Sequence, residues 1–354
     1  MLSNPVRIID LFSGCGGMTL GLIEACRALN MQVEPTCGVD IEQEALSVFA
    51  RNFTGALSVN HSVNRYLDGD LGSPLSDREQ IVRRWVKRKG SVDMLVGGPP
   101  CQGHSSLNNI TQRSDPKNQL YLRMARAAEV LDPDHVIIEN VIGVQHDDTG
   151  VFDVSRMHLE SLGYTVKSMI LRGERIGVPQ TRARVFMVAT KKASFANRKE
   201  IEERYGHSAR SFMWACEDLV GLNSPLTIDK PSSVAEVTQR RIDFLFDNGL
   251  YNLPNSERPP CHRDKEHTYN SVYGRIYGNE PCPTITTGYT TMGRGRFVHP
   301  TERRTITPHE AARVQFFPDY FDFGNDLTRE AHKRLIGNAV PPKMTFVLGL
   351  ELLR

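Results

Sequence analysis

A cysteine that follows two prolines is the residue of this sequence best suited to act as a nucleophile. Cys101 lies in the segment GGPPCQGHS, Gly97 to Ser105, directly after an apolar run at Val92–Val96. In open α/β sheets, ligands bind beyond the carboxyl ends of the strands, so this order of segments predicts a thiol that faces a ligand. The prolines stiffen the approach to Cys101. The polar stretch Gln102–Asn118 that follows is suited to close over a substrate as a lid.

A carboxylate and two arginines form a second group of candidates. Glu139 ends the apolar run IIENV, where a charge is expensive to bury without a task or a partner. In a dry pocket its pKa should rise, which suits it to share a proton with a substrate. Arg182 and Arg184 of the segment QTRAR alternate onto one strand face. They could hold a carbonyl oxygen or a phosphate, although surface salt bridging is an equally common reason for such arginines.

A glycine-rich turn offers a place for a cofactor. The segment DLFSGCGG has glycines at 14, 16 and 17 between an expected strand and an expected helix, which lets the backbone approach a ligand closely. Asp40 ends the next expected strand, where an acid can accept bonds from ribose hydroxyls. The glycines do not match GxGxxG, so a nicotinamide cofactor, a flavin, S-adenosylmethionine and simple tight packing of helix on strand all remain open.

The elements that would position these residues alternate between strand and helix. Strands are expected at Val6–Leu11, Gln32–Val39, Val92–Val96, His135–Glu139, Tyr164–Leu171 and Arg184–Thr190, with helices at Met18–Leu29, Gln43–Asn52, from Ser76 to Lys89, Leu120–Leu131 and after Val151. This alternation predicts an α/β fold with a doubly wound, largely parallel sheet. The pattern dissolves after Lys192, which predicts a smaller irregular domain. It returns at Thr307, where Thr-Pro-His-Glu has capping-box spacing, and continues in helices at Thr328–Ile336 and Pro342–Leu353.

Composition sets wider bounds. The 354 residues are 40% hydrophobic and 24% charged, which is ordinary for a globular protein. No apolar run approaches the roughly 18 residues of a membrane span, and Asp10 interrupts the apolar N-terminal stretch, which argues against a signal peptide. Seven scattered cysteines without a CxxC pair indicate reduced thiols in an intracellular protein. We expect no metal site, because Cys261, His262 and His267 lack a second ligand pair at suitable spacing.

Charge is uneven although the net charge is only +2. One basic cluster, between Arg78 and Lys89, is interpreted as a solvated helix face. A second cluster is interleaved with glycines that let the backbone approach a phosphate chain, so binding and a solvated surface are equally good interpretations of it. It contains Arg294, Arg296, Arg303 and Arg304.

Taken together and in this order, these segments resemble the DNA cytosine carbon-5 methyltransferase family of the bacterial and phage type. DLFSGCGG resembles its cofactor loop, GGPPCQ its nucleophile loop, ENV its acid motif and QTRAR its arginine motif. The segments RTITPHEAARVQFFPDYF, from Arg304, and RLIGNAVPP, from Arg334, resemble its two C-terminal motifs. The resemblance covers residues 6–192 and 283–354.

The resemblance implies a Rossmann-like domain that binds S-adenosylmethionine, formed by residues 1–192 and 305–354, and a target-recognition domain at 193–304. The C-terminal helix would return against the N-terminal one. The family usually has an acid after the third strand for the adenine amino group, and this chain has Val59-Asn60-His61-Ser62 there, so Asn60 or Ser62 would substitute. His104 stands where an aromatic residue is more usual. The implied cofactor residues are Phe12, Ser13, Gly14, Cys15, Gly16, Gly17, Asp40, Ile41, Asn60, Pro100, Asn338 and Ala339.

The resemblance also implies a mechanism on double-stranded DNA. Cys101 would add to carbon 6 of a flipped cytosine, and Glu139 would hydrogen-bond the ring nitrogen and the exocyclic amine. Arg182 or Arg184 would hold the base carbonyl or the nucleotide phosphate. Further DNA contacts are expected from Gln102, Ser105, Arg294 and Arg296. A monomer suffices for this chemistry, in the cytoplasm at the nucleoid, either alone or as the partner of a restriction endonuclease.

Three alternatives remain beside this interpretation. A member of the same family acting on tRNA would carry the same catalytic motifs, although the short N-terminus and the recognition-sized insert favour DNA. A DNA-binding relative without activity is disfavoured by the presence of Cys101, Glu139 and Arg182. A nicotinamide oxidoreductase fits the glycine spacing and the Pro-Cys-Gln loop poorly.

Overall fold

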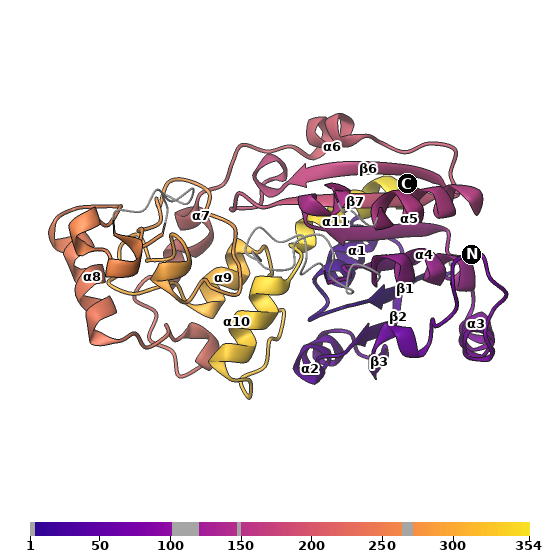
Figure 1. Cartoon of the computed structure of the whole chain (residues 1–354), viewed down its shortest axis with the longest axis horizontal. Coiled ribbons are helices and arrows are strands. Elements are labelled where there is room, and N and C mark those ends of the chain that lie inside the picture. Colours follow the sequence, from indigo (N-terminus) through magenta and orange to yellow (C-terminus); the bar gives the residue numbers. More distant parts are fainter. Residues whose placement is uncertain (1–3, 101–119, 147–149, 264–271) are drawn as a thin grey trace. The chain divides into compact units, whose positions relative to one another are not determined.

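The computed structural model describes residues 4–100, 120–146, 150–263 and 272–354, which form two compact units (Figure 1). The sheet unit comprises residues up to 172 together with 183–206 and 342–354. The irregular unit comprises residues 173–182 and 207–341. The expected domain boundary at 304–305 does not coincide with a boundary of these units, since residues 305–341 pack within the irregular unit. The catalytic and target-recognition domains, as functional divisions, stay predictions.

A seven-stranded sheet forms the centre of the sheet unit, in the order β3-β2-β1-β4-β5-β7-β6. Neighbouring strands from β3 to β5 pair in parallel, whereas β7 pairs antiparallel with both β5 and β6. The carboxyl ends of β1 to β5 therefore share one edge. The strands are β1 (Val6–Leu11), β2 (Val33–Asp40), β3 (Leu57–Asn60), β4 (Met94–Gly97), β5 (His135–Asn140), β6 (Thr165–Arg172) and β7 (Ala183–Thr190).

Helices cover both faces of this sheet. Side chains alternate between the faces along a strand. In β1, Ile9 and Leu11 join the apolar core that also contains residues of α4, while Asp10 faces the other way and accepts a hydrogen bond from Thr19 of α1. The helices of this unit are α1 (Gly17–Ala28), α2 (Gln43–Asn52), α3 (Asp77–Lys89), α4 (Leu120–Leu131), α5 (Val151–Ser161), α6 (Arg198–Tyr205) and α11 (Pro342–Leu353).

The C-terminal helix α11 returns against the N-terminal helix α1, as the sequence resemblance implied. Gly21 makes the close approach possible, because a Cβ atom there would lie 2.1 Å from the Pro342 carbonyl oxygen and from the Thr345 hydroxyl oxygen. The Thr345 hydroxyl donates a hydrogen bond of 3.0 Å to the Met18 carbonyl oxygen. The contact joins the helix after the glycine-rich turn to the last segment of the chain.

The irregular unit has short helices joined by long loops. Its longest helix, α8, packs a small apolar core with Leu253, Tyr273 and Val298. The Thr307 capping box at the start of α9 forms as predicted, with Glu310 completing it. The helices here are α7 (Phe212–Cys216), α8 (Glu236–Asp247), α9 (Pro308–Val314) and α10 (Arg329–Asn338).

The ends of most predicted strands and helices lie within two residues of the observed ends. The prediction of a largely parallel sheet is confirmed, with β7 as the exception, since it runs antiparallel between β5 and β6. Periodicity in the sequence gives an element's type but not its direction in a sheet. Among the described residues, no helix has the length and apolar character that crossing a membrane requires.

Replacing Gly21 with alanine should destabilise the protein. Helix propensity alone predicts a gain of about 1 kcal/mol for this change. The contacts with Pro342 and Thr345 predict the opposite, since the added methyl group would overlap both oxygens. We expect the free energy of unfolding in urea to fall by about 2 kcal/mol. Glu24→Ala in the same helix is the control, with an expected change within about 0.5 kcal/mol. A stabilised Gly21→Ala protein would contradict the packing described here.

Candidate functional site

The glycine-rich turn between β1 and α1 is fixed to the end of β2 by one carboxylate. Asp40 accepts hydrogen bonds from the backbone N–H groups of Gly14, at 2.8 Å, and Glu42, at 2.9 Å. Burial raises the pKa of this carboxyl group. Each carboxylate oxygen can accept a second hydrogen bond, so Asp40 can shape the turn and still accept from a ribose hydroxyl.

Two glycines of this turn are needed for different reasons. A Cβ atom on Gly16 would lie 2.2 Å from the ring of Phe53, so tight packing against α2 and its end explains this glycine. Gly14 has a φ of +53°, and a Cβ atom there would meet nothing within 4 Å. The turn thus packs tightly against Phe53 at Gly16. At Gly14 it leaves open space, where a ligand can approach the backbone.

Two polar atoms beside the turn are buried without a hydrogen-bond partner in the described part of the chain. They are the hydroxyl oxygen of Ser13 and one carboxylate oxygen, Oδ1, of Asp10. Buried polar groups normally have partners, and the exceptions call for an explanation such as a ligand. The thiol of Cys15 is different, because burial raises its pKa to about 12 and leaves it neutral. The turn therefore fits a polar cofactor that is held by backbone groups and by Ser13.

Residues at the carboxyl ends of β2 and β3 offer an apolar surface and a hydrogen-bond acceptor. Ile41 is 71% exposed directly after Asp40, which suits contact with the face of an aromatic ring. The Asn60 side-chain nitrogen donates to the carbonyl oxygens of Asp40, at 3.3 Å, and Ile41, at 2.9 Å. Its side-chain oxygen can accept from an amino group, which is the role expected of the missing acid. Ser62 instead caps the short helix η1 (Val63–Arg65).

An ion pair lies at the carboxyl end of β5. Glu139 Oε1 is 2.8 Å from Arg184 Nε, and the side chains are 10% and 16% exposed. The antiparallel pairing of β5 with β7 places the two residues on neighbouring strands. Gly98, directly after β4, leaves room for the carboxylate, since a Cβ atom there would lie 3.1 Å from Glu139 Oε2. Of the two predicted arginines, Arg184 is therefore the one beside Glu139.

The segment that leads to the predicted nucleophile is tied to the same strand end. The Asn140 side-chain nitrogen donates a hydrogen bond of 3.2 Å to the Pro99 carbonyl oxygen, and both residues are buried. Pro100 follows and is exposed. The predicted residues Cys101, Gln102, His104 and Ser105, and with them the expected lid, lie outside the described residues.

The C-terminal motifs are joined by a chain of buried hydrogen bonds within the irregular unit. Gln180 donates to the Gln315 side-chain oxygen at 2.7 Å, and Gln315 donates to the carbonyl oxygens of Ile336, at 2.6 Å, and Ala339, at 3.3 Å. Arg182 is 2% exposed and donates to the Ile285 carbonyl oxygen at 2.7 Å. Four segments of the chain thus hold one another, and Asn338 is exposed beside them.

The two arginines predicted to contact DNA differ in their surroundings. Arg296 donates to the carbonyl oxygens of Tyr251, at 3.0 Å, and Arg275, at 2.8 Å, and its guanidinium lies 4.6 Å from the ring centre of Tyr277. Arg294 is exposed at the end of the short helix η9 (Met292–Arg294). Arg296 is thus engaged within its own unit, whereas Arg294 presents its charge to solvent.

One cluster in the described residues has the composition of a metal site, but an arginine occupies it. His299, Glu302 and Glu310 offer ligand atoms within 4.8 Å of one another. The Arg304 guanidinium bonds to both carboxylates, and His299 Nδ1 accepts from the backbone N–H groups of Thr301 and Glu302. Burial also lowers the pKa of His299 to about 3. The cluster is an internal ion-pair network.

Sequence reasoning gave no role to three buried polar residues of these motifs. Asp10 is fully buried beside Thr19, and Gln180 and Gln315 join the C-terminal segments. An acid within an apolar strand was the available signal for Asp10. Nothing in the spacing of the two glutamines indicates that they bond to each other.

This sheet, with an antiparallel strand beside β5 and a glycine-rich turn after β1, gives the sheet unit a Rossmann-like α/β fold. The solved structure of the Schizosaccharomyces pombe Dnmt2 methyltransferase has a TM-score of 0.67 at 17% identity, covering 98% of each chain. That of a Spodoptera frugiperda DNMT2 mutant has a TM-score of 0.62 at 18% identity, covering 99% of this chain and 100% of that one. These likenesses concern the fold.

Sequence comparison identifies the family. The C-5 cytosine-specific DNA methylase family matches residues 6–354. The Type II methyltransferase M1.BsuMI of Bacillus subtilis is 46% identical over 100% of this chain and 82% of its own length. The Type II methylase M.HgiDII of Herpetosiphon aurantiacus is 28% identical over 98% of this chain and 95% of its own. The chain belongs to this family and is a DNA (cytosine-5-)-methyltransferase, which confirms the resemblance.

Asp10 should make stability fall as pH rises. Burial raises its pKa from 3.8 to about 7. Between these values the folded protein keeps a proton that the unfolded chain has lost, so unfolding becomes easier with increasing pH, by up to about 1.4 kcal/mol per unit. Asp10→Asn keeps an acceptor for Thr19 but cannot ionise. We expect urea unfolding between about pH 4 and pH 7 to show this slope in the wild type relative to Asp10→Asn. Equal slopes would contradict the assignment.

Proposed function

We propose that this chain methylates carbon 5 of a cytosine within a short sequence of double-stranded DNA, with S-adenosylmethionine as the donor. The observation that carries the proposal is the joint placement of three features at one edge of the sheet. They are the Glu139–Arg184 pair, the Pro99–Pro100 segment tied to Asn140, and the open turn in front of Gly14. A base-binding group, the approach to a thiol and a cofactor turn belong to one folded unit.

The cofactor residues of the sheet unit fit S-adenosylmethionine by the chemistry of their donors and acceptors. Asp40 can accept from ribose hydroxyls, the Asn60 side-chain oxygen from the adenine amino group, and Ser13 can bond to a polar end of the ligand. When bound, S-adenosylmethionine supplies an electrophilic methyl group. The roles expected of Asn338 and Ala339, which belong to the irregular unit, stay predictions.

Cys101 is proposed to start the reaction as a thiolate. Its sulfur forms a bond to carbon 6 of cytosine, and the electron pair of the double bond becomes available at carbon 5. Carbon 5 then takes the methyl group while the bond from that group to the donor sulfur breaks and leaves its electron pair on the sulfur. Glu139 hydrogen-bonds the ring nitrogen and the exocyclic amine, and Arg184 holds Glu139 in place. A base removes the proton from carbon 5, and the carbon–sulfur bond breaks to restore the thiolate.

Carbon 6 is hidden within a stacked duplex, so we propose that the enzyme flips the cytosine out. Arg294 is the candidate of the irregular unit for phosphate contacts, since it is exposed and its unit contains residues 207–304 of the predicted target-recognition domain. Two of its relatives are Type II methyltransferases, which supports a pairing with a restriction endonuclease. We further propose that a monomer is sufficient.

Cytosine methylation should depend on Cys101. We expect plasmid DNA from a host without its own cytosine methylation to show bisulfite-protected cytosines in one short sequence context when the wild type is expressed. Cys101→Ser, which lacks a nucleophile of sufficient strength, should give none while keeping the wild-type circular dichroism spectrum. No protection by soluble wild-type protein would refute the DNA proposal, and incorporation of labelled methyl groups into tRNA would support the tRNA alternative instead.

Arg184→Lys should slow methylation more than it weakens DNA binding. Lysine keeps the charge but loses the planar guanidinium whose Nε lies 2.8 Å from Glu139. We expect kcat to fall by about 100-fold, as for the loss of one preorganised transition-state group, with the Kd for DNA changed less than about threefold. Arg156→Lys on the exposed face of α5 is the matched control and should leave both values unchanged. An unaltered kcat in Arg184→Lys would remove Arg184 from the mechanism.

A further inference from the structure

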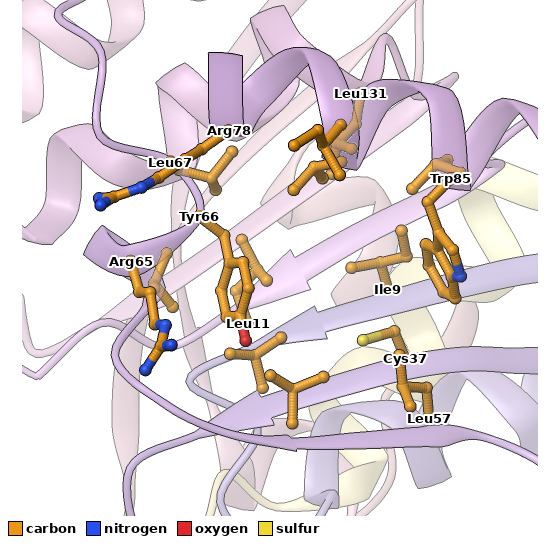
Figure 2. A pocket seen from close by; sticks show the side chains of 16 residues that line it. Ile9, Leu11, Cys37, Leu57, Arg65, Tyr66, Leu67, Arg78, Trp85 and Leu131 are labelled. Atoms are coloured by element: carbon orange, nitrogen blue, oxygen red, sulfur yellow. The ribbon is translucent and has the colours of Figure 1, made fainter. Parts of the chain in front are cut away.

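A separate apolar cavity of about 520 Å³ lies within the sheet unit, between strands β1 to β3 and helix α3 (Figure 2). Alternate residues of the strands line its floor, among them Leu11, Val39 and Val59, while Val82 and Trp85 of α3 line its other side. We propose that this cavity binds an apolar molecule that carries one anionic group. This proposal goes beyond DNA methylation.

The size and lining of the cavity suit a small organic ligand. Its volume falls in the range of about 300–1,000 Å³ that is typical of small-molecule sites, which are mostly apolar with few polar groups. Burial raises the pKa of the Cys37 thiol in the lining to about 12, so this side chain adds no charge. Leu57 and Ile81 also line the cavity and remain 46% and 58% exposed. A ligand with an apolar body would cover them.

Two arginines at one end of the cavity favour a ligand with a negative charge. Figure 2 shows Arg65 and Arg78 at the end opposite Trp85. Arg78 is paired with Asp68 at 3.3 Å. Arg65 has the ring nitrogen of His61 at 3.5 Å, and no carboxylate pairs with it among the described residues. A carboxylate or sulfonate group at this end would pair with Arg65 while the apolar body extends toward Trp85.

The cavity is distinct from the proposed cofactor site. Leu11, Val39 and Val59 each stand one position before a predicted cofactor residue, namely Phe12, Asp40 and Asn60. The strands thus line the cavity with their last inward side chains and reach the cofactor site with the next residue. A ligand in the cavity would lie beneath the loops that hold the cofactor without occupying their polar groups.

The two tryptophans of the chain allow a direct binding test. In a Trp214→Phe background, Trp85 becomes the only tryptophan. We use anilinonaphthalene sulfonate as the anionic probe and N-phenylnaphthylamine as its uncharged counterpart. We expect the anionic probe to quench Trp85 saturably with one site per chain, and to bind about threefold more tightly than the uncharged probe, as an exposed charge pair provides.

Substitutions of residues that line the cavity distinguish binding in the cavity from non-specific binding to apolar surface. Arg65→Gln should remove the preference for the anionic probe, whereas Arg84→Gln on the outer face of α3 should keep it. Val82→Phe, which adds no tryptophan, should fill the cavity and abolish quenching of Trp85 by both probes, with the unfolding midpoint in urea as the measure of an intact fold. Equal affinity of the two probes for the Trp214→Phe protein would overturn the proposal. So would displacement of the probe by S-adenosylmethionine, which would make the cavity part of the cofactor site.

Discussion

The parallel pairing of β1, β2, β4 and β5 is the constraint on which the site depends. Backbone hydrogen bonds between parallel strands fix their direction, so the segments that follow them emerge at one edge of the sheet. Asp40 and Glu139 lie at the carboxyl ends of such strands, and the glycine-rich turn and the Pro99–Pro100 segment follow such strands. Residues more than a hundred positions apart therefore lie at one edge of the sheet because strand pairing, rather than the local sequence, brings them together.

Burial gives several polar groups of this edge their specific roles. Asp40 accepts hydrogen bonds from two backbone N–H groups and so fixes the glycine-rich turn. Asp10 is more deeply buried, and its Oδ1 has no hydrogen-bond partner in the described part of the chain. Glu139 is compensated by Arg184 from the antiparallel strand β7. Because an uncompensated buried charge is costly, each of these carboxyl groups requires a partner, a proton or a ligand.

The same sheet serves different purposes on its two faces. On one face Asp10 bonds to Thr19 of α1, and α11 packs against α1 through Gly21. On the other face the strands meet α3 loosely enough to leave the apolar cavity beside Trp85. Alternation of side chains along a strand keeps these environments apart, although they are separated by only one residue in the sequence.

The sequence alone predicted most elements of the sheet unit, the family and the candidate residues, because apolar periodicity, capping residues and short motifs are local signals. It did not predict the helices α6, α7 and α8. It predicted helix Gln43–Asn52 to the residue and identified Glu139 as a buried acid. The tertiary structure decided which partner each side chain has. It paired Glu139 with Arg184 rather than Arg182, explained Gly16 by packing against Phe53, and joined distant segments of the chain. These contacts depend on strand direction and close approach, which no local pattern encodes.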